Sequence, residues 1–368
     1  MAVPTPSPPL VSAAAYLLMD ADSGHVIVEK NADQPLAPAS LTKIMTGYLL
    51  AHELAEGRAS NDDEVLISRQ AWAQNPLFAG SSLMWVEAGT RVRLEDLHRG
   101  LVVSSGNDAA LAIAEHLAGS ETAFAEMMNT HAQTLGMKGS NFVNSHGLPD
   151  PDHYTTPRDQ AILAAALIGG YPNEYALYRE REYTYNNIRQ YNRNGLLAEN
   201  SGVDGLKTGY TREAGYCLVA SAKRDDMRLI SVVMGSSGVR TRETATRELL
   251  NYGFRFYETH QLYTAGQELT SSRVWKGRQE QMTLAVKQQI YLTIPRGRHD
   301  DLEAVMEIKE TIVAPVEAGH SFGKLRISLD GETLVTAPLV AVDDIALAGL
   351  ASRLWDSVQM LFARATEG

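Results

Sequence analysis

A serine and a lysine three residues apart, Ser40 and Lys43, are the residues of this sequence best suited to chemistry. Apolar residues at helical spacing follow them, so we predict a helix that Pro38 helps to start, with Ser40 in its first turn. Free backbone N–H groups at a helix start favour developing negative charge, and residues at this spacing share one face. Lys43 can therefore reach the Ser40 hydroxyl, and an adjacent amine base is one way to make a serine nucleophilic.

The spacing alone is not specific, because Ser321 and Lys324 repeat it in a segment that we predict to be a strand edge. Two tripeptides elsewhere add weight to the first pair: Ser105-Gly106-Asn107 between two predicted helices, and Lys207-Thr208-Gly209 in a predicted strand. Each tripeptide alone is uninformative. Together and in this order, the motifs are the kind of set found in β-lactamases and penicillin-binding proteins.

A sheet and a group of helices must bring these motifs together. Strands are predicted near both ends of the first part of the chain, at Ala15–Asp20, His25–Glu29, Gly215–Ala222 and Arg228–Met234. The residues between them show mainly helical patterns, interrupted by a long irregular loop over residues 72–90. A last helix over residues 243–257 closes the domain. We therefore predict an α+β fold, with one antiparallel sheet built from both ends of the domain and covered by helices.

The composition changes near His260, where short alternating strands begin, and Asp330-Gly331 marks a β-hairpin. We predict a catalytic domain over residues 1–259 and a small all-β domain over residues 260–342. Residues 343–368 are predicted to contain an amphipathic helix that begins at Ile345. Its apolar stripe comprises Leu347, Leu350, Leu354, Val358 and Leu361, with Trp355 and Phe362 beside it.

The overall composition excludes several classes of protein. A chain of 368 residues with 44% hydrophobic residues is long enough for two domains with real cores. The net charge of −11 and the scattered basic residues argue against a nucleic-acid partner. The one cysteine, Cys217, excludes an intramolecular disulfide, and its apolar neighbours predict a buried strand residue.

Neither end of the chain shows a membrane-spanning segment. The start, Met1-Ala2-Val3-Pro4, lacks the basic head and apolar core of a signal peptide. This start fits a mature exported protein that carries a new initiator methionine, and a cytoplasmic protein would show the same start. No apolar run approaches the ~20 residues that a spanning helix needs.

The sequence resembles the low-molecular-mass penicillin-binding proteins, specifically the D-alanyl-D-alanine carboxypeptidases of types five and six. The resemblance covers nearly the whole chain, including the small β domain and the C-terminal helix. It is carried by the segments 38–43, 80–84, 105–109, 192–197, 204–209 and 291–298. It implies a β-lactamase/transpeptidase-like fold. One departure is Tyr210, which follows the Lys-Thr-Gly motif at a position that varies among relatives.

The resemblance also implies catalytic roles. Ser40 would attack an amide carbonyl after losing its proton to Lys43, whose pKa burial and the charge of Lys207 would lower. Asn107 would hold Lys43 and the substrate backbone together. Ser105 would pass a proton to the departing amine.

Substrate binding would involve the Lys-Thr-Gly strand and an arginine. Lys207, Thr208 and Arg242 would bind the terminal carboxylate with charge-assisted hydrogen bonds. Gly209 lies in the same segment and permits the close approach of another strand or of a ligand. The backbone N–H groups of Ser40 and Tyr210 would form the oxyanion hole.

The implied function is removal of the terminal D-alanine from peptidoglycan pentapeptide stems through a Ser40 acyl-enzyme, without a metal or other cofactor. β-Lactams would acylate the same serine. The implied location is the periplasm, on the outer face of the inner membrane, with the C-terminal helix docked on the membrane surface. The alternative for this helix is that it packs on its own β domain or pairs with a second copy of itself.

Three alternatives are open to comparison. A class A-like β-lactamase is the nearest, but the β domain, the C-terminal helix and Ser-Gly-Asn in place of Ser-Asp-Asn count against it. An inert wall-binding protein with the same fold is the second. A zinc carboxypeptidase is excluded, because Glu56 stands where the second histidine of a motif beginning at His52-Glu53 belongs. We read His146, near a glycine turn, as structural.

Overall fold

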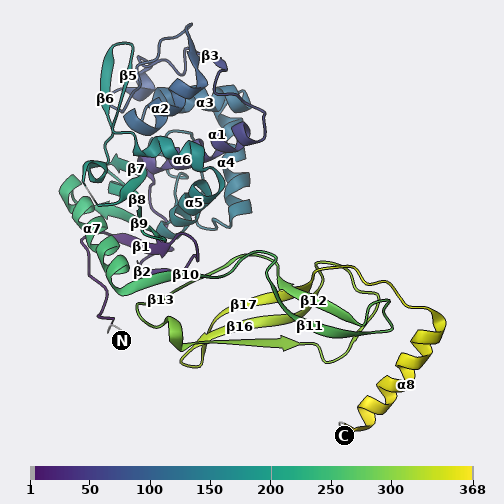
Figure 1. Ribbon diagram of the computed structural model, residues 1–368. Coiled ribbons are helices and arrows are strands. Elements are labelled where there is room, and N and C mark those ends of the chain that lie inside the picture. The colour runs from purple at the N-terminus through teal and green to yellow at the C-terminus, as the bar shows by residue number, and fades with distance from the viewer. Residues whose placement is uncertain (1–4, 200, 367–368) are drawn as a thin grey trace. The chain divides into compact units, whose positions relative to one another are not determined.

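The computed structural model describes residues 5–199 and 201–366, and of residues 361–366 only the backbone. Two compact units divide the chain, and the change from one to the other falls between Phe256 and Tyr257. Figure 1 shows the first unit as a mixed helix and sheet structure and the second as a β-rich structure followed by a helix. The predicted boundary after residue 259 would lie inside the first strand of the second unit, β10 (Tyr257–Tyr263).

One antiparallel sheet forms the centre of the first unit. Its five strands lie in the order β2-β1-β9-β8-β7. The first two come from the start of the chain and the other three from a region about 170 residues later, so the prediction of a sheet built from both ends is confirmed. The strands are β1 (Ala15–Asp20), β2 (Val26–Lys30), β7 (Val203–Thr211), β8 (Gly215–Arg224) and β9 (Met227–Ser236).

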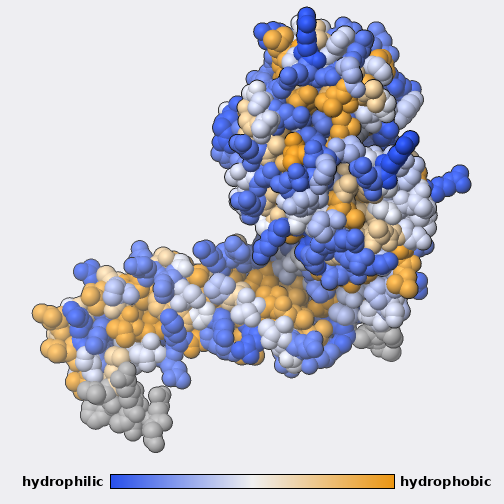
Figure 2. Space-filling model, turned by 180° about the vertical axis from the view of Figure 1, so that it is seen from behind, coloured by the Kyte–Doolittle hydropathy of each residue, from blue (hydrophilic) through white to orange (hydrophobic). Residues whose placement is uncertain are grey.

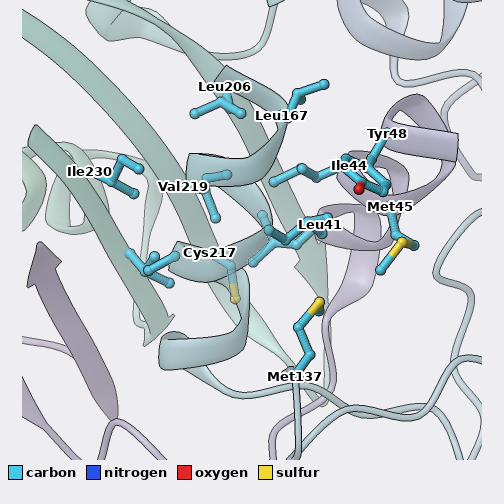
Figure 3. Close-up of a cluster of buried hydrophobic side chains, with 14 of the residues drawn as sticks. Leu41, Ile44, Met45, Tyr48, Met137, Leu167, Leu206, Cys217, Val219 and Ile230 are labelled. Atoms are coloured by element: carbon cyan, nitrogen blue, oxygen red, sulfur yellow. The ribbon is translucent and has the colours of Figure 1, made fainter. Parts of the chain in front are cut away.

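Helices cover both faces of this sheet. On one face, α1 (Thr42–Ala55) and α5 (Pro157–Gly170) share a core with strand residues such as Val219 and Ile230 (Figure 3). On the other face, α7 (Val239–Phe256) brings Gly253 against Leu18 and Leu229. Cys217 is fully buried in the first of these cores, as predicted.

The remaining helices of this unit surround the segments that carry the motifs. They are α2 (Leu94–Arg99), α3 (Asn107–Ala118), α4 (Glu121–Leu135) and α6 (Pro172–Tyr175). A wide π-type helical turn, Gly100–Ser104, follows α2 directly. Ser105 then adopts the left-handed conformation with φ of 60°, which ends the helical course before α3 begins.

Short β-hairpins that the sequence did not indicate complete the first unit. The strands β3 (Glu64–Leu66) and β4 (Arg91–Arg93) pair across the irregular loop, and β5 (Glu182–Tyr185) pairs with β6 (Ile188–Tyr191). β3 and β4 alternate between exposed and buried side chains and β5 between exposed and half-buried ones, over only three or four residues, and β6 is largely exposed. Such short segments carry little periodic signal.

The second unit contains a six-stranded sheet in the order β14-β16-β17-β12-β11-β15 and a separate pair, β10 with β13 (Ile290–Pro295). The strands of the larger sheet are β11 (Glu268–Trp275), β12 (Gln281–Val286), β14 (Leu302–Ile308), β15 (Ile312–Val313), β16 (Ser321–Leu329) and β17 (Glu332–Ala341). Asp330 and Gly331 join β16 to β17 with positive φ values, as the hairpin prediction requires.

The final helix, α8 (Leu350–Thr366), starts later than predicted. Ile345 is 2% exposed in the core of the β-rich unit and pairs with Val316, and Leu347 pairs with Gly277. The apolar residues before Leu350 therefore belong to the β structure. The predicted stripe residues Leu361 and Phe362 lie outside the described side chains.

Apolar side chains of α8 that the structure describes are largely exposed, and other exposed apolar residues lie on the surface of the β-rich unit (Figure 2). The exposed side chains of α8 are those of Leu350, Leu354, Trp355 and Val358. The helix is joined to the unit by a hydrogen bond from Arg273 to Gln359 and one from the Lys276 N–H to Asp356. Across the described ranges, no helix is long and apolar enough to cross a membrane.

Candidate active site

Ser40 lies in a tight 3-10 turn, Ala39–Leu41, that leads directly into α1. The sequence predicted the first turn of the α-helix itself, which is wrong by two residues. Ala39 has a φ of 48°, so the backbone bends sharply immediately before the serine. Ser40 is half-buried and faces a cleft, while the residues on either side of it are buried.

Lys43 is buried and makes three polar contacts with its amine. Nζ donates to Ser40 Oγ at 3.2 Å, to Asn107 Oδ1 at 2.6 Å and to the His146 carbonyl at 2.6 Å. The three acceptors come from three separate segments, so the amine has a fixed position beside the serine hydroxyl. This is the geometry that a base for Ser40 requires.

Burial lowers the pKa of Lys43 to about 7, since an amine removed from water favours its neutral form. The carboxylate of Asp108 raises the pKa and the guanidinium of Arg193 lowers it, but both effects are smaller than that of burial. Arg193 is thus a cation that opposes protonation of Lys43 in addition to Lys207, which the sequence suggested and whose amine interacts with that of Lys43. A substantial fraction of the amine is neutral near pH 7.

Lys207 places a second buried amine in the site. Its Nζ donates to Ser105 Oγ at 2.8 Å and to the carbonyl of Thr208 at 3.2 Å. Burial, followed by the positive charge of Lys43, lowers the pKa of Lys207 well below its ordinary value. The two amines therefore repel each other, and a bound anion would favour the protonated form of Lys207.

Asn107, the first residue of α3, and Ser105, two residues before it, each contact one of the two amines. Asn107 accepts from Lys43 and donates through Nδ2 to Ser81 Oγ at 2.9 Å. The left-handed backbone of Ser105 turns its hydroxyl toward Lys207. The structure therefore brings together five of the predicted catalytic residues: Ser40, Lys43, Ser105, Asn107 and Lys207.

A buried carboxylate fixes this turn against the irregular loop. Asp108 accepts the backbone N–H groups of Met84, Trp85 and Val86 at 2.8 to 3.1 Å. Gly106 lies so close to the loop that a Cβ there would be 2.9 Å from the Met84 nitrogen. Asp108 had no predicted role, although an acid in the first turn of a helix is a recognisable signal.

The predicted substrate-binding residues line the cleft beside Ser40. Thr208 is buried on β7, whereas the next side chain but one, Tyr210, is 52% exposed. Arg242, on α7, is buried, and its guanidinium donates to the carbonyls of Cys217 and Arg193 at 3.4 Å. The cleft has a volume of about 470 Å³. Its walls include Ser40, Ser81, Ser82, Ser105, Asn107, Leu148, Arg193, Thr208, Gly209, Tyr210, Tyr216, Val239 and Arg242.

Arg193 is a further cation of the cleft that sequence reasoning did not identify as functional. Its charge lowers the pKa values of Lys43, Lys207 and Arg242. Its segment was among those that carried the family resemblance, which is the signal that could have pointed to it. Burial is the largest cause of the lowered pKa of Arg242.

Two glycines allow the serine turn to pack closely. A Cβ on Gly209 would lie 3.0 Å from the Pro38 carbonyl and 3.3 Å from the Leu41 nitrogen, so only glycine lets β7 approach so near. A Cβ on Gly147, whose φ is 88°, would overlap the carbonyl of Ala39. Both flanks of Ser40 are therefore held by backbone contact.

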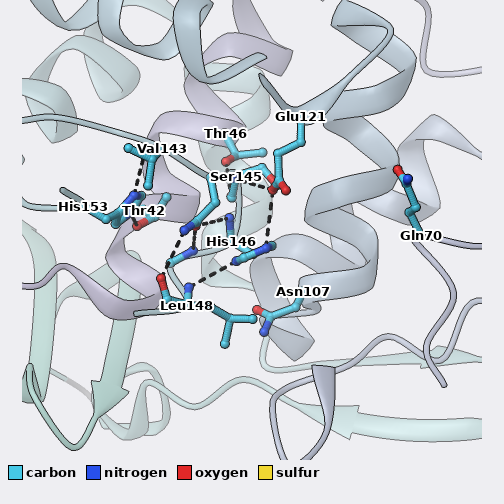
Figure 4. A network of polar contacts seen from close by, with 12 residues as sticks. Thr42, Thr46, Gln70, Asn107, Glu121, Val143, Ser145, His146, Leu148 and His153 are labelled. Atoms are coloured by element: carbon cyan, nitrogen blue, oxygen red, sulfur yellow. Dashed lines mark hydrogen bonds and ion pairs between the residues drawn. The ribbon is translucent and has the colours of Figure 1, made fainter. Parts of the chain in front are cut away.

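His146 belongs to a polar network that includes Glu121 and Ser145 (Figure 4). Its Nδ1 accepts the Leu148 N–H at 3.1 Å, and its Nε2 lies 3.4 Å from Glu121. Glu121 also accepts the N–H and hydroxyl of Ser145. Burial lowers the pKa of His146 to about 3, so the ring is neutral. These contacts hold the carbonyl that accepts from Lys43, which agrees with the structural interpretation.

His153 contacts Thr42, the residue that follows the turn of Ser40 (Figure 4). Its Nδ1 accepts the Val143 N–H at 3.0 Å, and burial lowers its pKa to about 4. The neutral ring therefore carries its proton on Nε2, 2.7 Å from the Thr42 hydroxyl. That hydroxyl donates to the Ala39 carbonyl at 2.9 Å, which completes a chain of contacts to the turn of Ser40.

The second Ser-x-x-Lys sequence has a different setting. Ser321 and Lys324 lie on β16, where the serine donates to the Gly323 carbonyl and the lysine pairs with Glu307 at 3.1 Å. Ser321 and Lys324 are also both exposed. Within the described chain, no cluster of residues is suited to hold a metal ion.

Comparisons with known proteins show the family to which this chain belongs. Residues 2–238 match the peptidase S11 family, described as D-alanyl-D-alanine carboxypeptidase. Residues 257–346 match the C-terminal domain of penicillin-binding protein 5. The D-alanyl-D-alanine carboxypeptidase DacA of Escherichia coli K12 is 43% identical over 360 residues, which cover 97% of this chain and 89% of the relative.

The similar solved structures are also penicillin-binding proteins. Penicillin-binding protein 5 from Haemophilus influenzae aligns with a TM-score of 0.89 at 41% identity, covering 93% of this chain and 99% of that one. The ampicillin-bound form of penicillin-binding protein D2 from Listeria monocytogenes aligns at 29% identity with a TM-score of 0.60, covering 67% of this chain and 100% of that one. The predicted fold class is thereby confirmed. The chain belongs to the S11 family and is a serine-type D-alanyl-D-alanine carboxypeptidase of the penicillin-binding protein group.

Proposed function

We propose that Ser40 is the nucleophile and Lys43 its general base. The observation that carries this assignment is the buried amine of Lys43, 3.2 Å from the serine hydroxyl and with a pKa of about 7. The neutral amine takes the proton of Ser40 as the hydroxyl oxygen attacks the carbonyl carbon of the peptide between the two D-alanines. Collapse of the tetrahedral intermediate leaves the acyl group on Ser40 and releases D-alanine.

The leaving amine takes the hydroxyl proton of Ser105, and Ser105 in turn receives the proton that Lys43 took from Ser40, so that Lys43 is neutral again. Lys207 donates to the Ser105 hydroxyl, which keeps the lone pair of that oxygen engaged and leaves its proton available to the cleft. Asn107 holds Lys43 with its oxygen, and its amide nitrogen faces Ser81 at the cleft wall. Water then attacks the acyl-enzyme with Lys43 again as base, and the shortened stem peptide leaves.

The carboxylate of the substrate binds among the cations of the cleft. Lys207, Thr208 and Arg242 are the proposed ligands, with Arg193 adding positive charge. In the described chain, Arg242 Nε is buried without a partner and the residue forms no ion pair, so a bound anion would satisfy it. The backbone N–H groups of Ser40 and Tyr210 form the proposed oxyanion hole. Gly209 keeps these two segments close.

β-Lactams are proposed to acylate Ser40 by the same route. A β-lactam is a cyclic amide with a carboxylate nearby, so it offers the carbonyl and the anion that this cleft is built to hold. The ampicillin-bound relative from Listeria monocytogenes supports the assignment by its similarity.

D-Alanine release should exceed penicillin hydrolysis by a wide margin. Free D-alanine would be measured from diacetyl-Lys-D-Ala-D-Ala, and benzylpenicillin hydrolysis would be followed in parallel with the same protein. We expect steady D-alanine release and hydrolysis of only a few equivalents of penicillin. Rapid penicillin turnover with no D-alanine would favour the class A-like β-lactamase, and neither activity would favour the inert wall-binding protein.

We further propose that the protein works in the periplasm and rests on the outer face of the inner membrane through α8. The exposed fractions of Leu350, Leu354 and Trp355 are 76%, 69% and 64%, which is a large apolar surface for one helix face. The segment from residue 343 has cations only at Arg353 and Arg364. Its other charged residues are acidic: Asp343, Asp344, Asp356 and Glu367. Apolar insertion is therefore the expected driving force, and anionic lipid should matter little.

Liposome binding tests this location. The truncation should remove residues 350–368 only, because Ile345 and Leu347 belong to the β-rich unit. We expect the full chain to bind neutral liposomes in high salt and the truncated chain to lose binding while it keeps D-alanine release. The double substitution Leu354→Ser and Val358→Ser should weaken binding, whereas Val305→Ser on β14 should not. Binding by the truncated chain would contradict the proposal.

A further inference from the structure

One side of the cleft carries an apolar wall that the carboxypeptidase mechanism does not use. We call Tyr210, Tyr216 and Val239 the aromatic wall. All three line the same cleft as Ser40. Tyr210 is 52% exposed and Val239 is 44% exposed, although both lie beside the reacting serine in a cleft that is otherwise mainly polar.

The two aromatic rings of the wall pack against each other. Tyr210 on β7 and Tyr216 on β8 are direct partners across the two strands, and their ring centroids are 4.3 Å apart. Cross-strand aromatic pairs of this kind stabilise each other and hold their rotamers. On its other side, the ring of Tyr216 lies 5.8 Å from the guanidinium of Arg242. Tyr216 thus links the exposed ring of Tyr210 to the proposed carboxylate site.

The position of the wall identifies the part of a substrate that would meet it. In the proposed function, Arg242 and Lys207 bind the carboxylate of the residue that is released. The side chain of that residue leaves the α-carbon, one bond from the carboxylate carbon, so it must lie within a few ångströms of Arg242 and hence near Tyr216. The methyl group of D-alanine covers little of such a surface.

We propose that the aromatic wall is a subsite for the side chain of the released residue, and that the enzyme cleaves stem peptides ending in larger apolar D-amino acids, such as D-leucine, as well as D-alanine. This inference rests on the proposed function. Apolar contact with two rings and Val239 favours the larger side chain by the area that it removes from water. The positive charge of Arg193 and Arg242 opposes a basic side chain of similar length.

A peptide series isolates this subsite. The peptides are diacetyl-Lys-D-Ala followed by glycine, D-alanine, D-leucine or D-lysine, and kcat/KM is measured from the released amino acid. Every peptide leaves the same acyl group on Ser40, so deacylation is common to all, and differences report acylation alone. We expect D-leucine to be released with a kcat/KM within about threefold of that for D-alanine, and D-lysine at least about tenfold more slowly.

The variants test whether the wall causes this tolerance. Tyr210→Ala should lower the ratio of D-leucine to D-alanine kcat/KM about tenfold, while Tyr210→Phe should keep it. Both retain the backbone N–H of residue 210. Tyr191→Ala, which removes a tyrosine exposed on β6 and outside the cleft lining, should leave the ratio unchanged. Thermal unfolding of each variant checks that the fold is intact.

The outcomes separate the two proposals. Normal D-alanine release with a ratio that Tyr210→Ala does not change would overturn the aromatic wall as a subsite and leave the proposed function standing. A wild-type enzyme that releases D-alanine but rejects D-leucine more than about thirtyfold would do the same. No release from any peptide would overturn both the site assignment and the subsite that depends on it.

Discussion

Replacing Lys43 by methionine will lower the rate of acylation by benzylpenicillin about 10³-fold at pH 7, the size of effect expected for loss of a general base. The amine is the only base within hydrogen-bond distance of the Ser40 hydroxyl among the described residues. Methionine has a similar length and cannot accept a proton. Burying an amine is unfavourable, but methionine leaves the Asn107 and His146 oxygens without their donor, so the two effects should largely offset each other and the fold should be retained. Stopped-flow measurement of acylation and a thermal melt would check both expectations.

Lys324→Met provides the matched control. It removes a lysine from the other Ser-x-x-Lys sequence, where the amine is exposed and pairs with Glu307. Acylation should be unchanged in this variant. A Lys43→Met enzyme that acylates within a few fold of the wild type would show that Lys43 is not the base.

The pH profile of acylation follows from the same residue. Only the neutral amine can accept the serine proton, and burial brings the pKa of Lys43 down to about 7. The rate should therefore fall about tenfold for each pH unit below that pKa and level off above it. With an ordinary lysine pKa of 10.5, the rate would instead keep rising through pH 9. If the acylation rate of Lys43→Met falls with decreasing pH in the same way as that of the wild type, the fall would have to come from the ionisation of another group.

Replacing Gly147 by alanine should lower acylation about 10²-fold and destabilise the protein by about 2 kcal/mol. The new Cβ would overlap the Ala39 carbonyl and lie 2.9 Å from the Thr42 hydroxyl. Either the serine turn or the segment that holds Lys43 through the His146 carbonyl must therefore move. Chemical denaturation and acylation kinetics would measure the two effects.

Gly136→Ala separates backbone strain from this collision. Gly136 has a φ of 81°, close to that of Gly147, but a Cβ there would meet nothing within 4 Å. It should cost about 1 kcal/mol of stability and leave acylation unchanged. Equal losses of activity in the two variants would mean that contact with the serine turn is not what Gly147 provides.

The local parts of the site follow from the sequence. Helical periodicity after Leu41 places Ser40 and Lys43 on one face, and β7, β8 and β9 follow from apolar runs separated by turn residues. The exact backbone of Ser40 does not follow, because the turn depends on the positive φ of Ala39. That conformation is set by contact with Gly147 and Gly209, which are distant in the chain.

Contacts between residues that are far apart in the sequence could not be predicted from the spacing of residues within each motif. Lys207 and Ser105 are 102 residues apart, and Lys43 and His146 are 103 apart. Only the resemblance to a known family joined these segments in advance. Arg193 and Asp108 remained unassigned, because a single charged residue in a loop or helix start looks like ordinary surface until the fold shows what it faces.

For the C-terminal helix, the sequence prediction placed the start too early, at Ile345 instead of Leu350. Its apolar spacing extended back to Ile345, and periodicity alone could not tell a helix start from a final β segment. The structure assigns Ile345 to the core of the β-rich unit by its 2% exposure and its pairing with Val316. Tertiary burial, which the sequence does not display, decided between the two.

Mass spectrometry of the intact protein after reaction with benzylpenicillin, followed by peptide mapping, tests most directly that Ser40 is the acylated nucleophile. We expect a single adduct, one penicillin per chain, on the peptide that contains Ser40, and no adduct in the Ser40→Ala variant. An adduct on another peptide, for instance the one that contains Ser321, or an adduct that persists in Ser40→Ala, would contradict the assignment.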